Sequence, residues 1–343
     1  MFNHKFGIEI EFTGITRSKA AEVAAAYFGG NARMRTSGDY YQSRYVTDSS
    51  GREWRFMSDA SISCQRKDGR RIVSASSEYS VELVSPILTY YEDIKAIQEL
   101  VRRLRKAGGF TNRSCGIHVH LNGADHTPTS LRNFINIVAS KNDLFYKALQ
   151  IPQERMRFCQ KMDAYLVERM NIHKPRTFQQ IESIWYEGYR ENRSSRYHNS
   201  RYHFLNLHSF FSSSGNRTVE LRGFNSQLHA GKIRAYVVLA LALNNHALTL
   251  KSASSRRVQS ENEKFAMRVF LNRIGFIGDE FKSCREHLYL HLDGNAAWRY
   301  GRDLRLDNRN AGIGNVYTAG ITSSNAVRSN DTAANYEEGE SDD

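Results

Sequence analysis

The sequence predicts an α+β fold with a mainly antiparallel sheet. Short strand-like segments fill residues 6–12 and much of 33–85, whereas long helical segments dominate the part that follows. Strands return after residue 201 and precede the last helices, so strands and helices do not alternate regularly as in a parallel α/β fold. We expect one domain over residues 1–300 and a flexible polar tail with an acidic end over residues 301–343.

The N-terminal part is predicted to hold the first strands and two helices. In residues 6–12, apolar residues alternate with acidic ones, as expected for a strand with two different faces. The two predicted helices, at 18–28 and 90–107, are each followed by a Gly-Gly pair. Glycine suits the left-handed backbone conformation that is common at helix C-termini. The predicted elements are the strand FGIEIEF (6–12), a helix at 18–28, the strands REWRFMSD (52–59) and YSVELVSP (79–86), an amphipathic helix at 90–107 and the strand GIHVHLN (116–122).

The second part is predicted to be mainly helical, with one further pair of strands. A polar loop rich in Arg and Tyr at residues 189–201 separates the two kinds of structure. The predicted helices lie at 129–149, 153–170, 177–188, 230–252, 259–273 and 279–291, and the predicted strands are YHFLNLHSFF (202–211) and RTVELRGF (217–224).

The charge distribution is compatible with an anionic ligand. The formal net charge is +12, but residues 329–343 carry six acidic residues and no Lys or Arg. Without those six negative charges the body of the protein is near +18. Such a body should attract polyanions such as nucleotides or nucleic acid, although surface charge that only aids solubility is an equal alternative.

Composition argues against a membrane or disulfide-stabilised protein. No run of about 18 apolar residues exists, and the first strand begins too early to leave room for a signal peptide. The four cysteines, Cys64, Cys115, Cys159 and Cys284, are widely spaced and form no C-x-x-C pair. This argues against a zinc knuckle or a disulfide framework, and we expect a cytoplasmic protein.

Four predicted strands share an unusual pattern, in which aliphatic residues on one face alternate with charged or ligand-type residues on the other. Because side chains alternate along a strand, each pair two positions apart shares a face. The pairs are Glu9 and Glu11, Ser80 and Glu82, His118 and His120, and Glu220 and Arg222.

Carboxylates and imidazoles together suit a divalent cation: Mg²⁺ prefers the oxygens, and Mn²⁺ accepts both. Without a cation, some of these clustered acids would be protonated at neutral pH. Each motif alone has a simpler explanation, because E-x-E can be a solvated face, H-x-H can be hydrogen-bonded core and E-x-R can be an ion pair. Cys115 is expected to be a small buried residue rather than a nucleophile. The case for a metal site depends on all four pairs occurring together.

The order of these motifs resembles the amidoligase family. The matching segments are the E-x-E strand, VELVSP, CGIHVH, RYHFLNL and TVELRGF, and the resemblance runs from about residue 6 to residue 250, with family-like helices beyond. This family belongs to the glutamine synthetase and glutamate–cysteine ligase superfamily of ATP-dependent carboxylate–amine ligases. The resemblance implies a curved antiparallel sheet that holds ATP and two or three Mg²⁺ or Mn²⁺ ions on its concave face, with helices packed on the outer face.

The resemblance also implies roles for individual residues. Glu9 and Glu11 would bind different metals, and Glu82, with Asp59 as a further candidate, would join one of these sites. His118 and Glu220 would complete the site that bridges the ATP phosphates, and Arg222 would hold the transferring γ-phosphate. The other residues in matching motifs are expected to bind metal (His120) or the nucleotide (Arg201, Tyr202 and Asn206).

The function implied is amide or peptide bond formation through an acyl phosphate, with a carboxylate donor and an amine acceptor that the sequence does not identify. No Walker A motif is present, so a carboxylate-and-metal face would take its place. Three alternatives stay open. Residues 184–204 interleave Arg with Trp and Tyr and could bind nucleic acid. The acids and histidines could serve a metal-dependent hydrolase, or the fold could be an assembly component without activity.

Overall fold

The computed structural model describes residues 2–34, 39–211, 217–257 and 260–299. Residues Met1–Ala296 form one compact unit. The tail expected at residues 301–343 lies outside the described residues, so its predicted character is not tested.

A large antiparallel sheet organises the described part of the chain, which confirms the predicted α+β class. Eight of the described strands form this sheet, in the order β2-β3-β4-β7-β1-β8-β10-β9, and every neighbouring pair is antiparallel. The strands are β1 (Phe6–Phe12), β2 (Ala32–Met34), β3 (Arg44–Thr47), β4 (Glu53–Met57), β7 (Val81–Val84), β8 (Gly116–Asn122), β9 (Leu205–Asn206) and β10 (Thr218–Asn225). A separate hairpin consists of β5 (Gln65–Asp68) and β6 (Arg71–Ser74).

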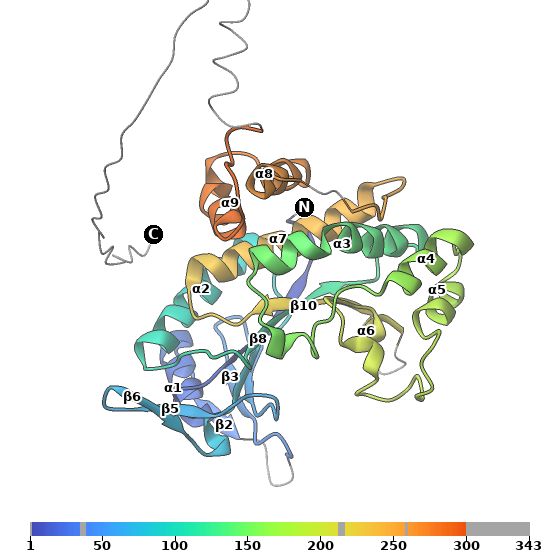
Figure 1. Ribbon diagram of the computed structural model, residues 1–343. Helices are drawn as coiled ribbons and strands as arrows, with labels where there is room; N and C mark the ends of the chain where they lie inside the picture. The colour runs from blue at the N-terminus through green and yellow to red at the C-terminus, as the bar shows by residue number, and fades with distance from the viewer. Residues whose placement is uncertain (1, 35–38, 212–216, 258–259, 300–343) are drawn as a thin grey trace, which may run out of the picture. The chain divides into compact units, whose positions relative to one another are not determined.

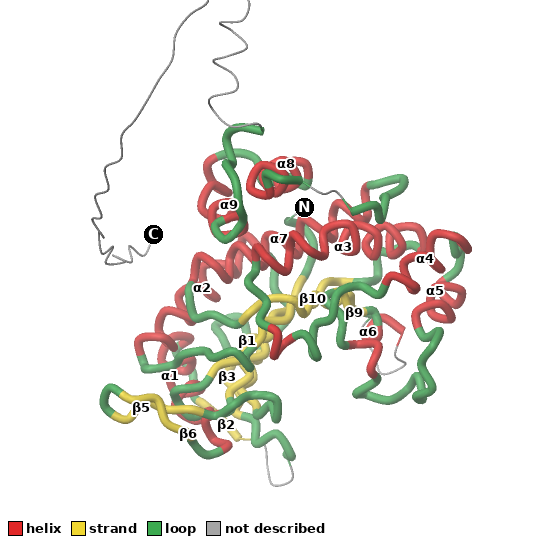
Figure 2. The backbone as a smooth tube through the Cα atoms, viewed as in Figure 1, coloured by secondary structure: helices red, strands yellow, loops and turns green. Residues whose placement is uncertain are grey.

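Helices cover one face of this sheet. The long helix α7 packs against β8 and contacts α2 and α3, and these three helices form a layer over the central strands, while α9 contacts α7 on the side away from the sheet (Figures 1 and 2). The helices are α1 (Arg17–Phe28), α2 (Tyr90–Lys106), α3 (Pro128–Ala148), α4 (Ala164–His173), α5 (Phe178–Trp185), α6 (His208–Phe211), α7 (Ala230–Thr249), α8 (Glu263–Arg273) and α9 (Lys282–Tyr289).

Local sequence signals set several helix ends. The Thr16 hydroxyl accepts a hydrogen bond from the Lys19 backbone N–H at the start of α1, and Gly29 ends this helix with a φ of 75°. At the start of α3, Thr127 and Ser130 form a capping box. Gly29 agrees with the predicted glycine stop of this helix, and α1 packs next to strands β2 to β4.

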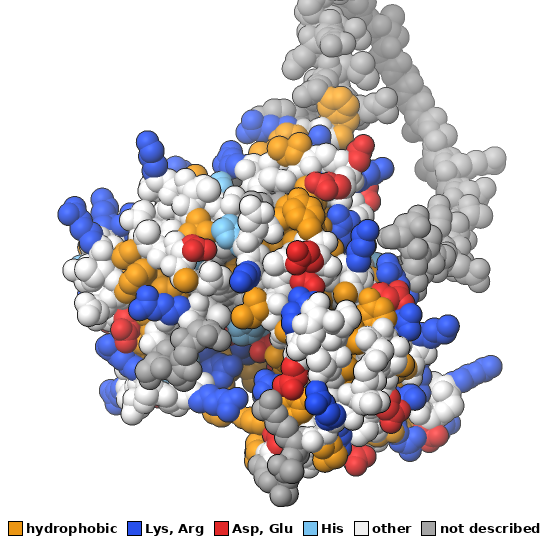
Figure 3. Space-filling view, turned by 180° about the vertical axis from the view of Figure 1, so that it is seen from behind, with side chains coloured by type: hydrophobic (Ala, Val, Ile, Leu, Met, Phe, Trp, Pro, Cys, Tyr) orange, Lys and Arg blue, Asp and Glu red, His pale blue; other side chains and the backbone are white. Residues whose placement is uncertain are grey.

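The surface carries many basic side chains. In the space-filling view, Lys and Arg side chains are spread over the visible face with Asp and Glu side chains between them (Figure 3). In the described part of the chain, none of the helices is both long and apolar enough to cross a membrane. The four cysteines are free thiols, and Cys115 is buried as expected.

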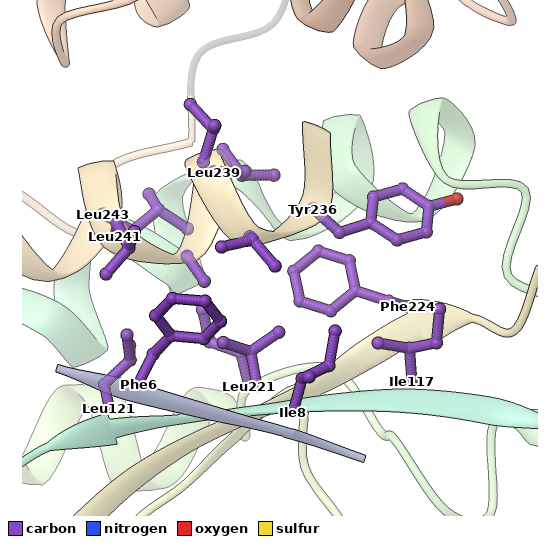
Figure 4. Packing of buried hydrophobic residues seen from close by; sticks show 14 of the residues in the cluster. Phe6, Ile8, Ile117, Leu121, Leu221, Phe224, Tyr236, Leu239, Leu241 and Leu243 are labelled. Atoms are coloured by element: carbon purple, nitrogen blue, oxygen red, sulfur yellow. The ribbon is translucent and has the colours of Figure 1, made fainter. Parts of the chain in front are cut away.

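The apolar face of the sheet forms the core with α7. Ile8, Val119 and Leu221 lie side by side in register on β1, β8 and β10, and all three are buried. Figure 4 shows these strands directing apolar side chains toward α7, where Tyr236 stacks on Phe224 with 4.8 Å between ring centroids. Burial of this face therefore fixes the opposite face of the same strands as the polar one.

Two predicted elements are wrong in part. The helix predicted at 153–170 is a short 3₁₀ turn at Gln153–Arg155 followed by α4 from Ala164, because Gln160 instead forms a backbone bridge with His203. The strand predicted at 202–211 is reduced to Leu205–Asn206. The Asn206 side chain accepts a hydrogen bond from the His208 backbone N–H, and the chain then turns into α6.

Candidate active site

The ligand-type residues lie on one face of the central strands. Glu11 is directly opposite Glu82 on β7, and Glu9 is opposite His118 on β8. Further along the sheet, Glu220 of β10 is opposite His120. Directly opposed residues in antiparallel strands share a face, so pairs that are far apart in the sequence converge here.

Glu9 is the centre of this arrangement. Its Oε2 lies 2.9 Å from His118 Nδ1, and its Oε1 lies 3.1 Å from His120 Nε2. His118 is also 3.7 Å from Glu220 Oε1 through Nδ1 and 3.8 Å from Glu11 Oε1 through Nε2. When the Nδ1–H of neutral His118 donates to Glu9, Nε2 keeps a free lone pair that can bind a cation.

Three overlapping groups of side chains have the spacing of metal sites. In each group, one ligand atom per residue lies within 4.8 Å of the others. Glu9 and Glu82 each belong to two groups, which places the groups side by side across the sheet. The groups are Glu9, Glu82 and His118; Glu9, His120 and Glu220; and Glu11, Asp59 and Glu82. All seven residues predicted to bind metal therefore lie in these groups, and their role as ligands stays a prediction.

The residues fit divalent cations by two criteria. The donor set consists of carboxylate oxygens and imidazole nitrogens, which suits Mg²⁺ at the all-carboxylate group and Mn²⁺ at either type. The Nε2 atom of His120 is buried and has no well-directed hydrogen bond in the described structure. Its contact with Glu9 Oε1 at 3.1 Å leaves this nitrogen poorly satisfied, and a better-placed partner would lower the cost of burying it.

Two of the acids have raised pKa values. Burial, together with the nearby Asp59 carboxylate, raises the pKa of Glu11 to about 8. Burial and the charges of Glu9 and Glu11 raise the pKa of Glu82 well above its ordinary value. Without a cation, Glu11 therefore holds a proton at neutral pH, and the pKa of Glu82 is shifted in the same direction, as the clustering of acids predicts.

The pKa values of His118, His120 and Glu220 are shifted in different directions. Burial lowers the pKa of His118 to about 4, with Arg222 adding to the effect. For His120, burial acts in the same direction, but the charges of Glu9 and Glu220 outweigh it and raise the pKa to about 9. Burial would raise the pKa of Glu220, but Arg222 and the two histidines lower it to about 2. His118 is therefore neutral and ready to bind a cation, whereas Glu220 is ionised.

Arg222 and Asn206 hold Glu220 from two sides. Arg222 Nη1 donates to Glu220 Oε1 at 2.5 Å, and Asn206 Nδ2 donates to Glu220 Oε2 at 2.7 Å. Because all three side chains are buried, these contacts fix the direction of the Glu220 carboxylate. Gly223, next to Arg222, leaves room for the Phe204 ring, since a Cβ there would lie 1.9 Å from that ring.

A cavity of about 680 Å³ opens over the acids. Glu9, Glu11, Asp59 and Glu82 line one part of it together with His118. Its cationic lining residues are Arg17, Arg55, Arg155, Arg196, Arg201 and Arg222. Tyr202 also lines the cavity, whereas His120, Asn206 and Glu220 are not among its lining residues. The predicted nucleotide contacts Arg201 and Tyr202 thus face the cavity, and Asn206 lies behind Glu220.

Comparison with known proteins identifies the family of this chain. A family model described as "Putative amidoligase enzyme" matches residues 3–244, which is more than half of the chain and includes all the clustered side chains. The chain belongs to this amidoligase family. No match was found among curated proteins.

The sequence analysis did not identify Arg155, which also lines the cavity. Its buried guanidinium donates to the carbonyl oxygens of Phe224 at 2.5 Å and Arg222 at 3.3 Å, and it lowers the pKa of Glu11 against the effect of burial. A Cβ on Gly116 would lie 2.2 Å from Arg155 Nη2, so any other residue there would force the Arg155 guanidinium to shift. The glycine before IHVH is the sequence signal that could have indicated a close neighbour at this point.

The sequence analysis also did not identify Arg17 and Arg55 as lining residues of the cavity. Arg17 lies at the start of α1, where its buried side chain donates to the carbonyl oxygens of Ser77 at 2.5 Å and Ser80 at 2.9 Å. Arg55 lies on the polar face of β4, opposite Val84. In the sequence, both look like ordinary residues of a helix and a strand. No sequence pattern shows which parts of the chain will fold over the sheet and enclose a cavity.

The Arg- and Tyr-rich segment at 184–204 contributes side chains to the same cavity. Arg196, Tyr197, Arg201 and Tyr202 line the same cavity as the acids. This placement favours a basic rim around the site over a separate nucleic-acid-binding surface.

Proposed function

We propose that the protein is an ATP-dependent carboxylate–amine ligase that forms an amide or peptide bond through an acyl phosphate. The proposal includes a sheet of the glutamine synthetase and glutamate–cysteine ligase type, curved around its substrates. The observation that carries it is the set of three overlapping carboxylate and imidazole groups on one sheet face, beside the Arg222 guanidinium. Family membership supports a ligase rather than a hydrolase.

The chemistry needs charge neutralisation because a carboxylate and the ATP phosphates are both anions. Bound Mg²⁺ or Mn²⁺ ions would neutralise these charges and align the reacting groups. The residues that would hold them are Glu9, Glu11, Asp59, Glu82, His118, His120 and Glu220. The neutral state of His118 and the ionised state of Glu220 suit this duty.

Arg222 is the residue best placed to act on the transferring phosphate. Although burial opposes it, the Glu220 carboxylate keeps the pKa of Arg222 above its ordinary value, so the guanidinium stays charged. Its Cζ lies 5.9 Å from the centre of the Tyr202 ring, and both side chains line the cavity. A planar guanidinium can bind two phosphate oxygens at once, which an ammonium group cannot do in the same geometry. Asn206 would act indirectly, by holding Glu220 in place.

The test is ATP turnover with mixed substrates. The full chain is incubated with ATP and Mg²⁺ together with pools of amino acids, polyamines or peptides, and ADP and phosphate are measured. We expect phosphate release that requires both a carboxylate and an amine, and the pool that stimulates it identifies the substrate class. Turnover that is the same without an amine, or with water as the only acceptor, would contradict the ligase function.

A further inference from the structure

The arginines that line the cavity are of two kinds. Some donate hydrogen bonds to oxygen atoms of the protein itself, and these are Arg17, Arg155, Arg201 and Arg222. The other two are Arg55 and Arg196, which we call the unpaired arginines. In the described part of the chain, their guanidinium groups make no hydrogen bond and no ion pair. Their N–H groups are therefore available to a ligand in the cavity.

Arg55 lies beside the acids of the sheet. On β4, Met57 is directly opposite Glu82 of β7, and Arg55 is two positions away from Met57 on the same face. Diagonal neighbours of this kind in antiparallel strands are within reach of a long side chain. A ligand group bound to Arg55 would therefore lie close to the predicted metal sites.

Two tyrosine rings hold Arg196. Its Cζ lies 5.3 Å from the centre of the Tyr41 ring and 5.6 Å from that of the Tyr197 ring. The two tyrosine hydroxyls are 3.0 Å apart, and the Tyr41 carbonyl oxygen accepts a hydrogen bond from the Ser58 backbone N–H at the end of β4. Tyr41 thus connects the segment that carries Arg196 to the strand that carries Arg55. Contact with a ring face restrains a guanidinium and leaves its N–H edge free to bind an anion.

The unpaired arginines are not needed by the groups that the proposed function already places. Cations at the acids would neutralise the ATP phosphates and the reacting carboxylate, and Arg222 would hold the transferring phosphate. The acid nearest to Arg196 in the sequence, Glu191, instead accepts a hydrogen bond from the Asn199 backbone N–H at 2.8 Å. A donor with a single carboxylate would leave both unpaired arginines without a partner. Two further carboxylates would satisfy them, because a guanidinium binds a carboxylate through two parallel hydrogen bonds.

We propose that the carboxylate donor is a polycarboxylate such as an acidic peptide. This inference rests on the proposed ligase function and names its substrate class. One carboxylate of the donor lies at the predicted metal sites and reacts, while two others bind Arg55 and Arg196. The unpaired arginines therefore select the donor by its charge and take no part in the chemical step.

The test is peptide binding to the full chain with Mg²⁺ and without ATP. A labelled, end-blocked peptide of three glutamates is titrated into the protein, and fluorescence anisotropy is measured. We expect Arg55→Gln and Arg196→Gln each to weaken binding about tenfold or more, the loss typical of a hydrogen bond to a charged group. Arg193→Gln is the matched control and should leave binding unchanged, because Arg193 is exposed on the same segment as Arg196 and does not line the cavity. A peptide of three glutamines should bind wild type about tenfold more weakly or worse, for the same reason.

Three outcomes would overturn the proposal. Equal loss of binding with Arg193→Gln would mean that general surface charge binds the peptide. Equal binding of the glutamine peptide would remove the charge pairing. Tighter binding of a phosphoserine peptide, with the same dependence on Arg55 and Arg196, would assign these arginines to phosphates instead of carboxylates.

Two features keep the test decisive. Arg196 is exposed and its side chain donates no hydrogen bond in the described structure, so Arg196→Gln should fold normally even if Arg55→Gln does not. The binding measurement needs no ATP turnover, so it separates this inference from the ligase function. Peptide binding without turnover would contradict the ligase function alone, whereas turnover with a monocarboxylate and no binding of the glutamate peptide would contradict this inference alone.

Discussion

Glu220 and Leu221 are neighbours on β10, and both are almost fully buried, yet they belong to opposite faces of the sheet with opposite energetic roles. Leu221 lies among apolar side chains beneath α7, where burial stabilises the fold. Glu220 lies among acids and histidines, where burial of charge costs free energy unless partners offset it. The comparison indicates that the apolar face of the strands stabilises the fold. The polar face instead contains buried charges that cost free energy, and we assign these charges to function.

The free-energy cost of burying charge on the polar face appears in the pKa values of its acids. Glu11 and Glu82 are opposed across β1 and β7, and burial and neighbouring acids raise the pKa values of both, to about 8 for Glu11. A sequence selected only for stability would not place acids in these positions, whereas functional sites commonly contain such groups. Substitutions on the two faces should therefore separate activity from stability.

The largest effect is expected for the acids. Glu11→Gln and Glu220→Gln should each abolish ATP turnover and weaken Mn²⁺ binding, because each removes a negatively charged ligand. The thermal midpoint should stay the same or rise for Glu11→Gln, since the substitution removes a buried group crowded by other acids. Turnover, Mn²⁺ titration and thermal unfolding check this, with Glu22→Gln, a substitution of an exposed acid on α1, as the control. Unchanged turnover in both variants would exclude the metal role.

Arg222→Lys should have the next largest effect. The lysine keeps the charge but loses the planar fork, so we expect ATP to bind while turnover falls by about 10³-fold or more, as for other arginines in phosphoryl transfer. Nucleotide binding and single-turnover kinetics separate the two steps. Turnover within about fivefold of wild type would remove Arg222 from the mechanism.

Leu221→Ala should change stability instead of chemistry. Removing this buried side chain leaves a cavity beneath α7, and we expect a loss of about 2–5 kcal/mol in the free energy of unfolding. Denaturant titration measures this loss, and Mn²⁺ affinity of the remaining folded protein should match wild type. A large loss of Mn²⁺ affinity without a loss of stability would show that the two faces are not separable.

The smallest effect concerns pH. The folded-state pKa of Glu11, about 8, exceeds its ordinary value of 4.5, so between these pH values the folded protein holds a proton that the unfolded chain has lost. The metal-free protein should therefore lose stability as pH rises through this range. Because cations bind the deprotonated acids, Mn²⁺ should raise the thermal midpoint more near pH 8 than near pH 5. Thermal unfolding with and without Mn²⁺ checks this, and a larger Mn²⁺ effect near pH 5 would contradict it.

The sequence predicted the polar face better than the surrounding loops. Glu9, His118 and Glu220 follow a period of two within apolar strands, so local spacing alone places each on one face of its strand. Arg155 follows no such pattern, because its role depends on a loop that folds back to the carbonyl oxygens of β10. The predicted helix over that loop failed for the same reason: long-range contacts outweighed local helix periodicity.

The central claim is that acids and histidines from distant strands bind divalent cations together. The most direct measurement is X-ray diffraction at the manganese absorption edge from crystals grown with Mn²⁺ and a non-hydrolysable ATP analogue. The account predicts anomalous peaks about 2–2.3 Å from ligand atoms of Glu9, Glu82 and His118. Anomalous peaks only at other places on the protein would contradict it.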